Sequence, residues 1–185
     1  MIRKDITESM IQNVLMNRKE LLSRISMRVN FLFETMQDLD DEIRSVSIGQ
    51  KNYDAIYGGT TNKRRELIDT LQQIYYRKNK YIEEIKAEIL FLLDEEDTIR
   101  RIWTCFHALP LLENEVLRRL YVERQSWKQA KAEMKINHRI FVSLRKSGFE
   151  QIIYLYHENY SNHQIRDMSE IKLRKRRNLA YEKKE

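Results

Sequence analysis

The sequence predicts an all-α protein, with a long N-terminal helical hairpin or coiled coil followed by a C-terminal helix-turn-helix. Charged residues make up 34% of the 185 residues, and there are only four glycines and one proline. This balance favours long solvated helices over sheets. Two long segments repeat apolar residues every seven positions, and shorter amphipathic segments follow the single proline. These patterns carry the prediction of the fold class.

The first long helix is predicted over residues 11–46. Two series of apolar residues recur there at intervals of seven, and the second series is interrupted only by Arg18. A heptad pattern held over this many turns gives a helix a stripe that packs against another helix. The first series is Leu15, Leu22, Val29, Met36 and Ile43, and the second is Ile11, Ile25, Leu32, Leu39 and Val46.

The second long helix is predicted over residues 62–106, and Lys78 and Glu96 break its heptads. The segment Thr60–Thr61–Asn62 offers a cap for the first turn. We expect the acidic run 94–97 to mark a break or kink in this helix. The two apolar series are Ile68, Tyr75, Ile82, Ile89 and Trp103, and Leu71, Ile85, Leu92, Ile99 and Phe106.

Residues 47–61 are expected to connect the two helices, because Gly49, Gly58 and Gly59 oppose a continuous helix. Two helices of similar length joined by a loop suggest an antiparallel hairpin. The alternative is a parallel coiled-coil homodimer, in which one helix pairs with its twin in a second copy. The sequence does not decide between these arrangements. The length of the loop also leaves room for a partner-binding role.

A helix-turn-helix is predicted over residues 109–156. Leu109–Pro110 ends the preceding helix, since proline cannot extend a helix at its interior. Ser126 is placed to cap a short helix, Lys135–Ile136–Asn137 to form the turn, and Asn137 to cap the last helix. The residues expected to be buried in three successive helices are Leu112, Val116, Leu117, Leu120 and Tyr121, then Trp127, Ala130 and Met134, then Phe141, Leu144, Gly148 and Ile152, where Gly148 allows a close helix approach.

The charge distribution separates the same parts of the chain. Residues 1–108 carry 17 Lys and Arg against 18 Asp and Glu, whereas residues 109–156 carry nine against five. The remaining C-terminal residues carry eight against five, so all the excess positive charge lies in the C-terminal part. This polarity suits a neutral scaffold joined to a nucleic-acid-binding end. The expected domains are a helical hairpin or coiled coil at 1–107, the helix-turn-helix at 108–157 and a basic tail at 158–185.

The segment SWKQAKAEMKINHRIFVSLRKSGFEQI resembles the region-4 helix-turn-helix of sigma factors, whose usual pattern runs Thr-Leu-x-x-Ile-Ala-x-x-Leu-x-Val-Ser-x-x-x-Val-x-x-Ile. Leu109–Pro110 with Glu115–Val116–Leu117 resembles the leading helix of that family. In layout the chain is also similar to the sigma-region-4-like regulators of phages and prophages of Gram-positive bacteria, the group that includes the ArpU- and RinA-type late-gene regulators. The matched core positions are Trp127, Ala130, Met134, Ile136, Phe141 and Leu144.

The resemblance implies a set of DNA-facing residues. Arg139 could bridge the O6 and N7 atoms of guanine, and His138 or Ser143 could bond a base edge or a phosphate. Val142 stands where sigma factors usually carry a polar or basic residue, and it could contact a thymine methyl group or pack against protein. Lys135 replaces the usual Gly or Asp of the turn. The implied surface consists of His138, Arg139, Val142, Ser143, Arg145 and Lys146, with Lys128, Lys131 and Lys135 in contact with phosphates.

Other interpretations of these charges stay open at the level of sequence. The basic residues of the last helix could form an ordinary solvated helix face. In the tail, the basic run Lys172 with 174–177 could add phosphate contacts, or it could belong to a solvated terminal helix.

No catalytic, cofactor or metal site is expected. The four histidines, His107, His138, His157 and His163, lack metal-ligand spacing, and no glycine-rich phosphate loop is present. Cys105 is the single cysteine, which favours a reducing compartment. The longest apolar run is too short to cross a membrane, and no apolar signal region follows the first residues. A cytoplasmic protein is therefore expected.

These observations predict a transcription regulator of phage or prophage genes that binds double-stranded DNA near promoters and contacts RNA polymerase. The N-terminal half resembles a coiled coil and not a promoter-melting domain, so a sigma factor proper is not expected. The main alternative is a protein-interaction adaptor that docks on RNA polymerase or another regulator without reading DNA. A structural phage component, such as a packaging protein, is a further alternative.

Overall fold

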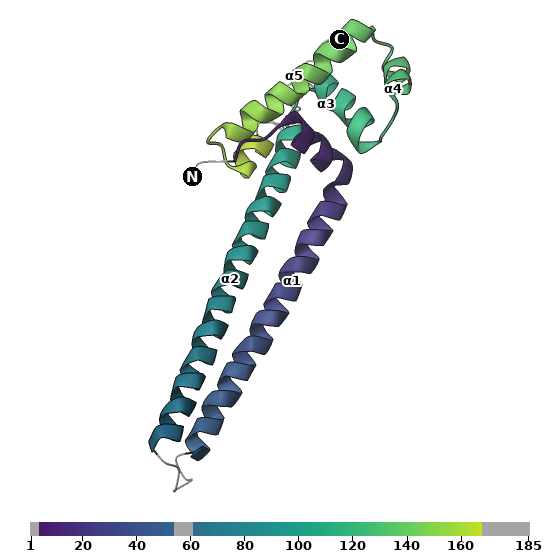
Figure 1. Ribbon diagram of the computed structural model, residues 1–185. Helices are drawn as coiled ribbons and strands as arrows, with labels where there is room; N and C mark the ends of the chain where they lie inside the picture. The colour runs from purple at the N-terminus through teal and green to yellow at the C-terminus, as the bar shows by residue number, and fades with distance from the viewer. Residues whose placement is uncertain (1–3, 54–60, 168–185) are drawn as a thin grey trace. The chain divides into compact units, whose positions relative to one another are not determined.

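The computed structural model describes residues 4–53 and 61–167, and within these ranges the only regular elements are helices. The all-α prediction is therefore confirmed. None of the described helices is long and apolar enough to span a membrane. The helices, drawn in Figure 1, are α1 (Glu8–Tyr53), α2 (Thr61–His107), α3 (Leu111–Leu117), the π-helix η1 (Arg118–Val122), α4 (Trp127–Met134) and α5 (His138–His157).

The chain divides into two compact units, and their limits differ from the predicted domain limits at 107 and 157. The hairpin unit comprises Ser23–Glu95, and the terminal unit comprises Met1–Leu22 together with Glu96–Glu185. The terminal unit thus includes the first turns of α1 and the last turns of α2. The reason is burial, because Ile11 at the start of α1 and Ile102 near the end of α2 are fully buried.

In the hairpin unit the two predicted apolar stripes pack against each other within one chain. Leu32 of α1 forms a buried cluster with Ile85 and Ile89 of α2. Beside this cluster the Nε atom of Arg28 donates a hydrogen bond of 2.8 Å to Glu88. Figure 1 shows the two helices running side by side in opposite directions. The stripes therefore pair as an antiparallel hairpin inside one chain. The half-buried members of the cluster are Met36, Leu39 and Leu92.

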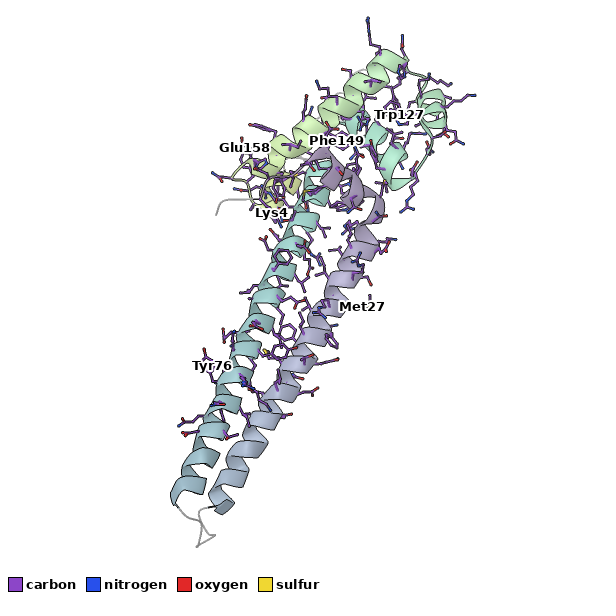
Figure 2. The ribbon with its side chains drawn as sticks, in the orientation of Figure 1. Lys4, Met27, Tyr76, Trp127, Phe149 and Glu158 are labelled. Carbon is purple, nitrogen blue, oxygen red and sulfur yellow. The ribbon has the colours of Figure 1, made fainter. Side chains whose placement is uncertain are left out.

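The hairpin unit also exposes many large apolar side chains. A pair of helices buries only the stripe along which they touch, so apolar residues elsewhere on their surfaces face solvent. Met27 and Tyr76, labelled in Figure 2, lie on the outer sides of α1 and α2. The exposed set in this unit is Met27, Phe31, Phe33, Ile74, Tyr76, Tyr81, Leu90, Phe91 and Leu93.

Two predicted breaks in the long helices are wrong. α1 continues to Tyr53, so Gly49 lies inside it, and α2 continues through residues 94–97 without interruption. A single glycine costs a helix only about 1 kcal/mol, which the rest of a long helix can offset. Acidic residues in a row project around a helix, and Glu96 pairs with Arg100 one turn later at 2.6 Å. Residues 54–60 of the predicted loop lie outside the described residues.

The kink in the long helices falls instead at Asn17 of α1, where φ is −124° and ψ is 16°. Arg124 caps the opened backbone, since its Nη2 atom donates to the carbonyl oxygen of Met16 at 3.0 Å and to Oδ1 of Asn17 at 2.8 Å. The next residue, Arg18, lies with its guanidinium 4.5 Å from the centre of the Trp103 ring. Arg18, the residue that interrupts the second apolar series of the first helix, therefore lies next to the kink.

The terminal unit is built around a fully buried core to which α3 and α5 make a close contact. A Cβ atom added at Gly148 would lie 3.0 Å from Cδ1 of Leu117 and 3.5 Å from Cβ of Glu113. The prediction that Gly148 permits a close helix approach is therefore confirmed. The largest fully buried side chains of this core are Phe106, Phe141, Phe149, Ile11, Ile102, Leu117, Ile152 and Ile165.

Arg101 joins the end of α2 to the end of α5. Its side chain is 4% exposed, and its guanidinium donates five hydrogen bonds to acceptors in residues 155–162. Two of the acceptors are the carbonyl oxygens of Leu155 and Tyr156 in the last turn of α5. The carbonyl oxygens of a last turn have no following helical N–H groups to bond them. The cation also lies at the negative end of the helix dipole. The five bonds run to Tyr156 O at 2.9 Å, Tyr160 O at 2.8 Å, Asn162 Oδ1 at 3.0 Å, Leu155 O at 3.2 Å and Glu158 O at 2.8 Å.

We predict that Arg101→Ala lowers the free energy of unfolding by about 2–4 kcal/mol, because it leaves several buried acceptors without donors. The matched control is Arg100→Ala. Arg100 is exposed, and among the described residues its ion pair is with Glu96 of the same helix, so its loss should cost less than about 0.5 kcal/mol. Denaturant unfolding followed by circular dichroism measures both changes. Equal effects of the two substitutions would contradict the role given to Arg101.

Candidate nucleic-acid interface

α4 begins at the predicted cap. The Oγ atom of Ser126 accepts a hydrogen bond from the backbone N–H of Gln129 at 3.3 Å, and the side chain of Gln129 accepts one from the backbone N–H of Ser126 at 3.2 Å. This reciprocal capping box satisfies two donors of the first turn. Ala130 is fully buried as expected, but Trp127 is 44% exposed, so its predicted burial is wrong. The centre of its ring lies 5.4 Å from the centre of the Phe141 ring, and the two ring planes are tilted by 59°.

The turn between α4 and α5 also has the predicted residues. Lys135 ends α4 in the left-handed conformation with φ of 52°, and Oδ1 of Asn137 accepts a hydrogen bond from the N–H of Arg139 at 3.2 Å. A residue with a Cβ atom is strained in this conformation, which explains why Gly is more usual there. Ile136 packs on a core cluster that fixes α4 and α5 against α3 and η1. The cluster consists of Val116, Leu120, Ala130 and Phe141, and Tyr121, Met134, Ile136 and Leu144 pack against it.

A set of ion pairs orients α4 on η1. Arg119 of η1 pairs with Glu133 of α4, and its Nε atom also donates to Glu115 of α3 at 2.7 Å. Arg118 pairs with Glu115 at 2.8 Å and with Glu123. The hydrogen bond from Arg118, with a smaller contribution from Arg119, holds the pKa of the Glu115 carboxyl below its usual range. Three of the five carboxylates in residues 109–156 therefore face arginines of the same segment.

The first half of α5 presents the predicted recognition residues on one exposed face. Arg139, Val142, Ser143 and Lys146 are all exposed, and their spacing of three, four and seven residues places them on the same side of the helix. Lys146 lies 3.7 Å from Glu150 one turn further along. His138, at the start of the helix, is also exposed, and its ring is centred 6.3 Å from that of Trp127.

The predicted phosphate-contacting lysines lie on α4 and at its end. Lys128 and Lys135 are exposed, and Lys131 is half-buried. Lys128 and Lys131, three positions apart, share one face of α4, and Lys135 follows in the turn after the helix. The basic run of the tail, which includes Lys172, lies outside the described residues.

Arg145 is the one predicted DNA-facing residue that the structure places inside the protein. Its side chain is only 22% exposed, and its Nε atom donates a hydrogen bond of 2.7 Å to the hydroxyl oxygen of Tyr121. Its guanidinium lies 4.9 Å from the centre of the Phe149 ring and 5.7 Å from that of Trp127, with Glu8 at 3.7 Å. In this arrangement Arg145 packs against the protein, and contact with DNA would require it to leave these partners.

No family model, curated protein or solved structure matches this chain. In the part of the chain that the structure describes, no group of three or more His, Cys, Asp or Glu residues could hold a metal ion. The candidate site is the exposed face of α5 together with the lysines of α4 and of the turn that follows it.

We predict that Arg145→Ala lowers the free energy of unfolding by about 1–2 kcal/mol, because it removes a hydrogen bond and several cation–π contacts. Tyr121→Phe should have a smaller effect, since it removes the hydrogen bond and keeps the aromatic surface. Arg139→Ala is the control, as an exposed arginine of the same helix whose loss should be nearly neutral for stability. If thermal unfolding ranks Arg139→Ala as the more damaging change, the packing role is wrong.

Proposed function

We propose that this protein is a sequence-specific DNA-binding transcription regulator of phage or prophage genes. It would act near promoters and contact RNA polymerase, as the resemblance to sigma region 4 implies. The observation that carries the proposal is the exposed face of α5. Arg139, Val142, Ser143 and Lys146 lie together on a helix that starts immediately after a capped helix and a tight turn. A helix in this position of a helix-turn-helix enters the major groove with its first residues at the base edges.

The chemistry of this face suits a major groove. Arg139 carries the planar fork of donors that matches the O6 and N7 atoms of guanine, the commonest specific contact. Ser143 can bond either kind of base edge. Lys146 is further along the helix and, as an exposed cation, fits a phosphate better than a base. These roles follow from side-chain chemistry together with exposure on one helix face.

The lysines of α4 supply the contacts that hold such a helix in register. Phosphate contacts fix the orientation of a protein on the duplex without reading sequence. Lys128 on α4 and Lys135 at its end are exposed, and the half-buried Lys131 lies between them in the sequence. Arg118 and Arg119 are paired with glutamates, so the free basic charge of this segment comes mainly from the lysines of α4 and from α5.

A second function is favoured by one observation. Trp127, Ile140 and Val142 are exposed apolar residues of α4 and α5, at 44%, 52% and 39%. Exposed aromatic and aliphatic side chains are also typical of protein interfaces. An adaptor that docks on RNA polymerase or another regulator through these residues, without reading DNA, would explain them equally well.

We predict that Arg139→Ala combined with Lys146→Ala weakens binding to the DNA that the natural protein captures by about 30-fold or more, since a bidentate base contact and a phosphate contact are lost. Helicity by circular dichroism should not change, because both side chains are exposed. The ligand would be found by capturing fragments of host and phage DNA with the full chain, and the footprint length would report whether one copy or a homodimer binds.

The matched control for this double variant is Arg77→Ala with Lys80→Ala, which removes the same charge from exposed positions of α2. Its affinity should remain within about threefold of the natural protein. Equal losses of DNA affinity in the two double variants would mean that net charge alone explains the effect. The recognition-helix assignment would then be rejected.

We also predict a steep dependence of binding on salt. Four lysine–phosphate contacts imply that raising the salt from 50 to 200 mM weakens DNA binding by about 100-fold. A docking contact made by apolar residues should change little over the same range. Titrations with captured DNA and with purified RNA polymerase, at both salt concentrations, therefore separate the regulator from the adaptor.

A further inference from the structure

Val142 is an apolar residue at the centre of an otherwise polar face. It is three residues after Arg139 and four before Lys146, so all three lie on one side of α5, and Ser143 is its neighbour there. The side chain is 39% exposed, so it does not complete the core of the terminal unit. A single exposed valine is common on protein surfaces. Val142 differs from such a residue because it lies between two cations, Arg139 and Lys146, on the candidate recognition face.

The major groove offers one apolar group to such a side chain. Of the four bases, only thymine presents a C5-methyl group there, beside the hydrogen-bonding edges that Arg139 and Ser143 can reach. Removing a methyl group from water against a valine strengthens binding by about fourfold. A polar side chain at the same position would gain nothing from the methyl group.

The spacing along α5 locates this contact relative to the contact of Arg139. Three residues of an α-helix advance by about 4.5 Å, and adjacent base pairs are about 3.4 Å apart. A valine three residues after the guanine-reading arginine therefore meets the next base pair or the one after it. The two side chains together specify a short step that contains guanine and thymine.

We propose, on the basis of the proposed function, that Val142 is a specificity-determining residue that reads the C5-methyl group of a thymine within one or two base pairs of the guanine bound by Arg139. The same methyl chemistry is present in 5-methylcytosine, so both pyrimidines have to be compared. Ile140 provides an internal control. It is also an exposed aliphatic residue of α5, but two positions from Val142 it lies on a different side of the helix.

The test begins with selection of bound duplexes from a random-sequence pool by the full chain. Each thymine of the selected duplex is then replaced singly by deoxyuridine, which removes only the methyl group. For the natural protein, deoxyuridine at one or two neighbouring positions should weaken binding by about fourfold. In Val142→Ala most of the difference should disappear, because the shorter side chain loses most of its contact, and Ile140→Ala should keep the difference. Placing 5-methylcytosine or cytosine at the same position shows whether the methyl group alone is sufficient.

The outcomes distinguish this inference from the proposed function. If the pool yields no enriched duplex, sequence-specific DNA binding is rejected, and the reading of thymine is rejected with it. If a duplex is enriched but every deoxyuridine substitution leaves the affinity unchanged, Val142 does not read a methyl group, although the regulator stands. A deoxyuridine effect that persists in Val142→Ala would assign the contact to another residue and overturn the inference.

Discussion

The buried guanidinium of Arg101 is the constraint on which the terminal unit depends. An arginine has five N–H donors in a rigid plane, and burying it is costly unless those donors find acceptors. Here the acceptors are four backbone carbonyl oxygens and one side-chain oxygen at and beyond the end of α5. The end of α2 and the end of α5 must therefore meet within hydrogen-bond tolerance. Nearer the start of α5, Arg145 donates a hydrogen bond to Tyr121, and Asn137 caps the first turn. The candidate recognition face thus belongs to a helix held at three points along its length.

Charged residues of the terminal unit have two distinct tasks. Arg101, Arg119 and Arg145 have well-defined partners inside the protein, and the carboxylates that face Arg118 and Arg119 come from α3, from the turn after η1 and from α4. Arginine suits these positions, since its planar fork bonds several acceptors at once. The lysines of α4 and the exposed residues of α5 form the other group. Net charge alone would count both groups as equally available to a nucleic acid, and the structure separates them.

The elements with a local signal in the sequence could be predicted, and the long-range contacts could not. The heptad stripes, the cap at Ser126 and the turn ending at Asn137 all follow from spacing and residue type. Arg101 gave no such signal, because its acceptors are mainly backbone carbonyl oxygens, which every residue has. A partial clue did exist, since Arg101 is close in sequence to Ile102, Cys105 and Phe106, and the apolar side of a helix is the side that becomes buried. The contacts of Arg145 could not be predicted for a related reason: its neighbours in space, Tyr121 and Glu8, come from distant parts of the chain. Gly49 misled because a breaking residue shows only a preference, which a long helix overrides.

The terminal unit is discontinuous in sequence, and this has a consequence for the order in which the protein can fold. Its core needs side chains from the first 22 residues, such as Ile11, together with side chains that follow Glu95, so the 73 residues Ser23–Glu95 must be synthesised between the two contributions. Closing a loop of that length carries an entropic cost, which slows folding when contacts are distant in sequence. Early pairing of the two long helices would fold most of the residues in this loop. Fewer flexible residues would then contribute to the entropic cost of closing it. The hairpin would then serve as a folding guide on the ribosome, formed before α5 has left the exit tunnel.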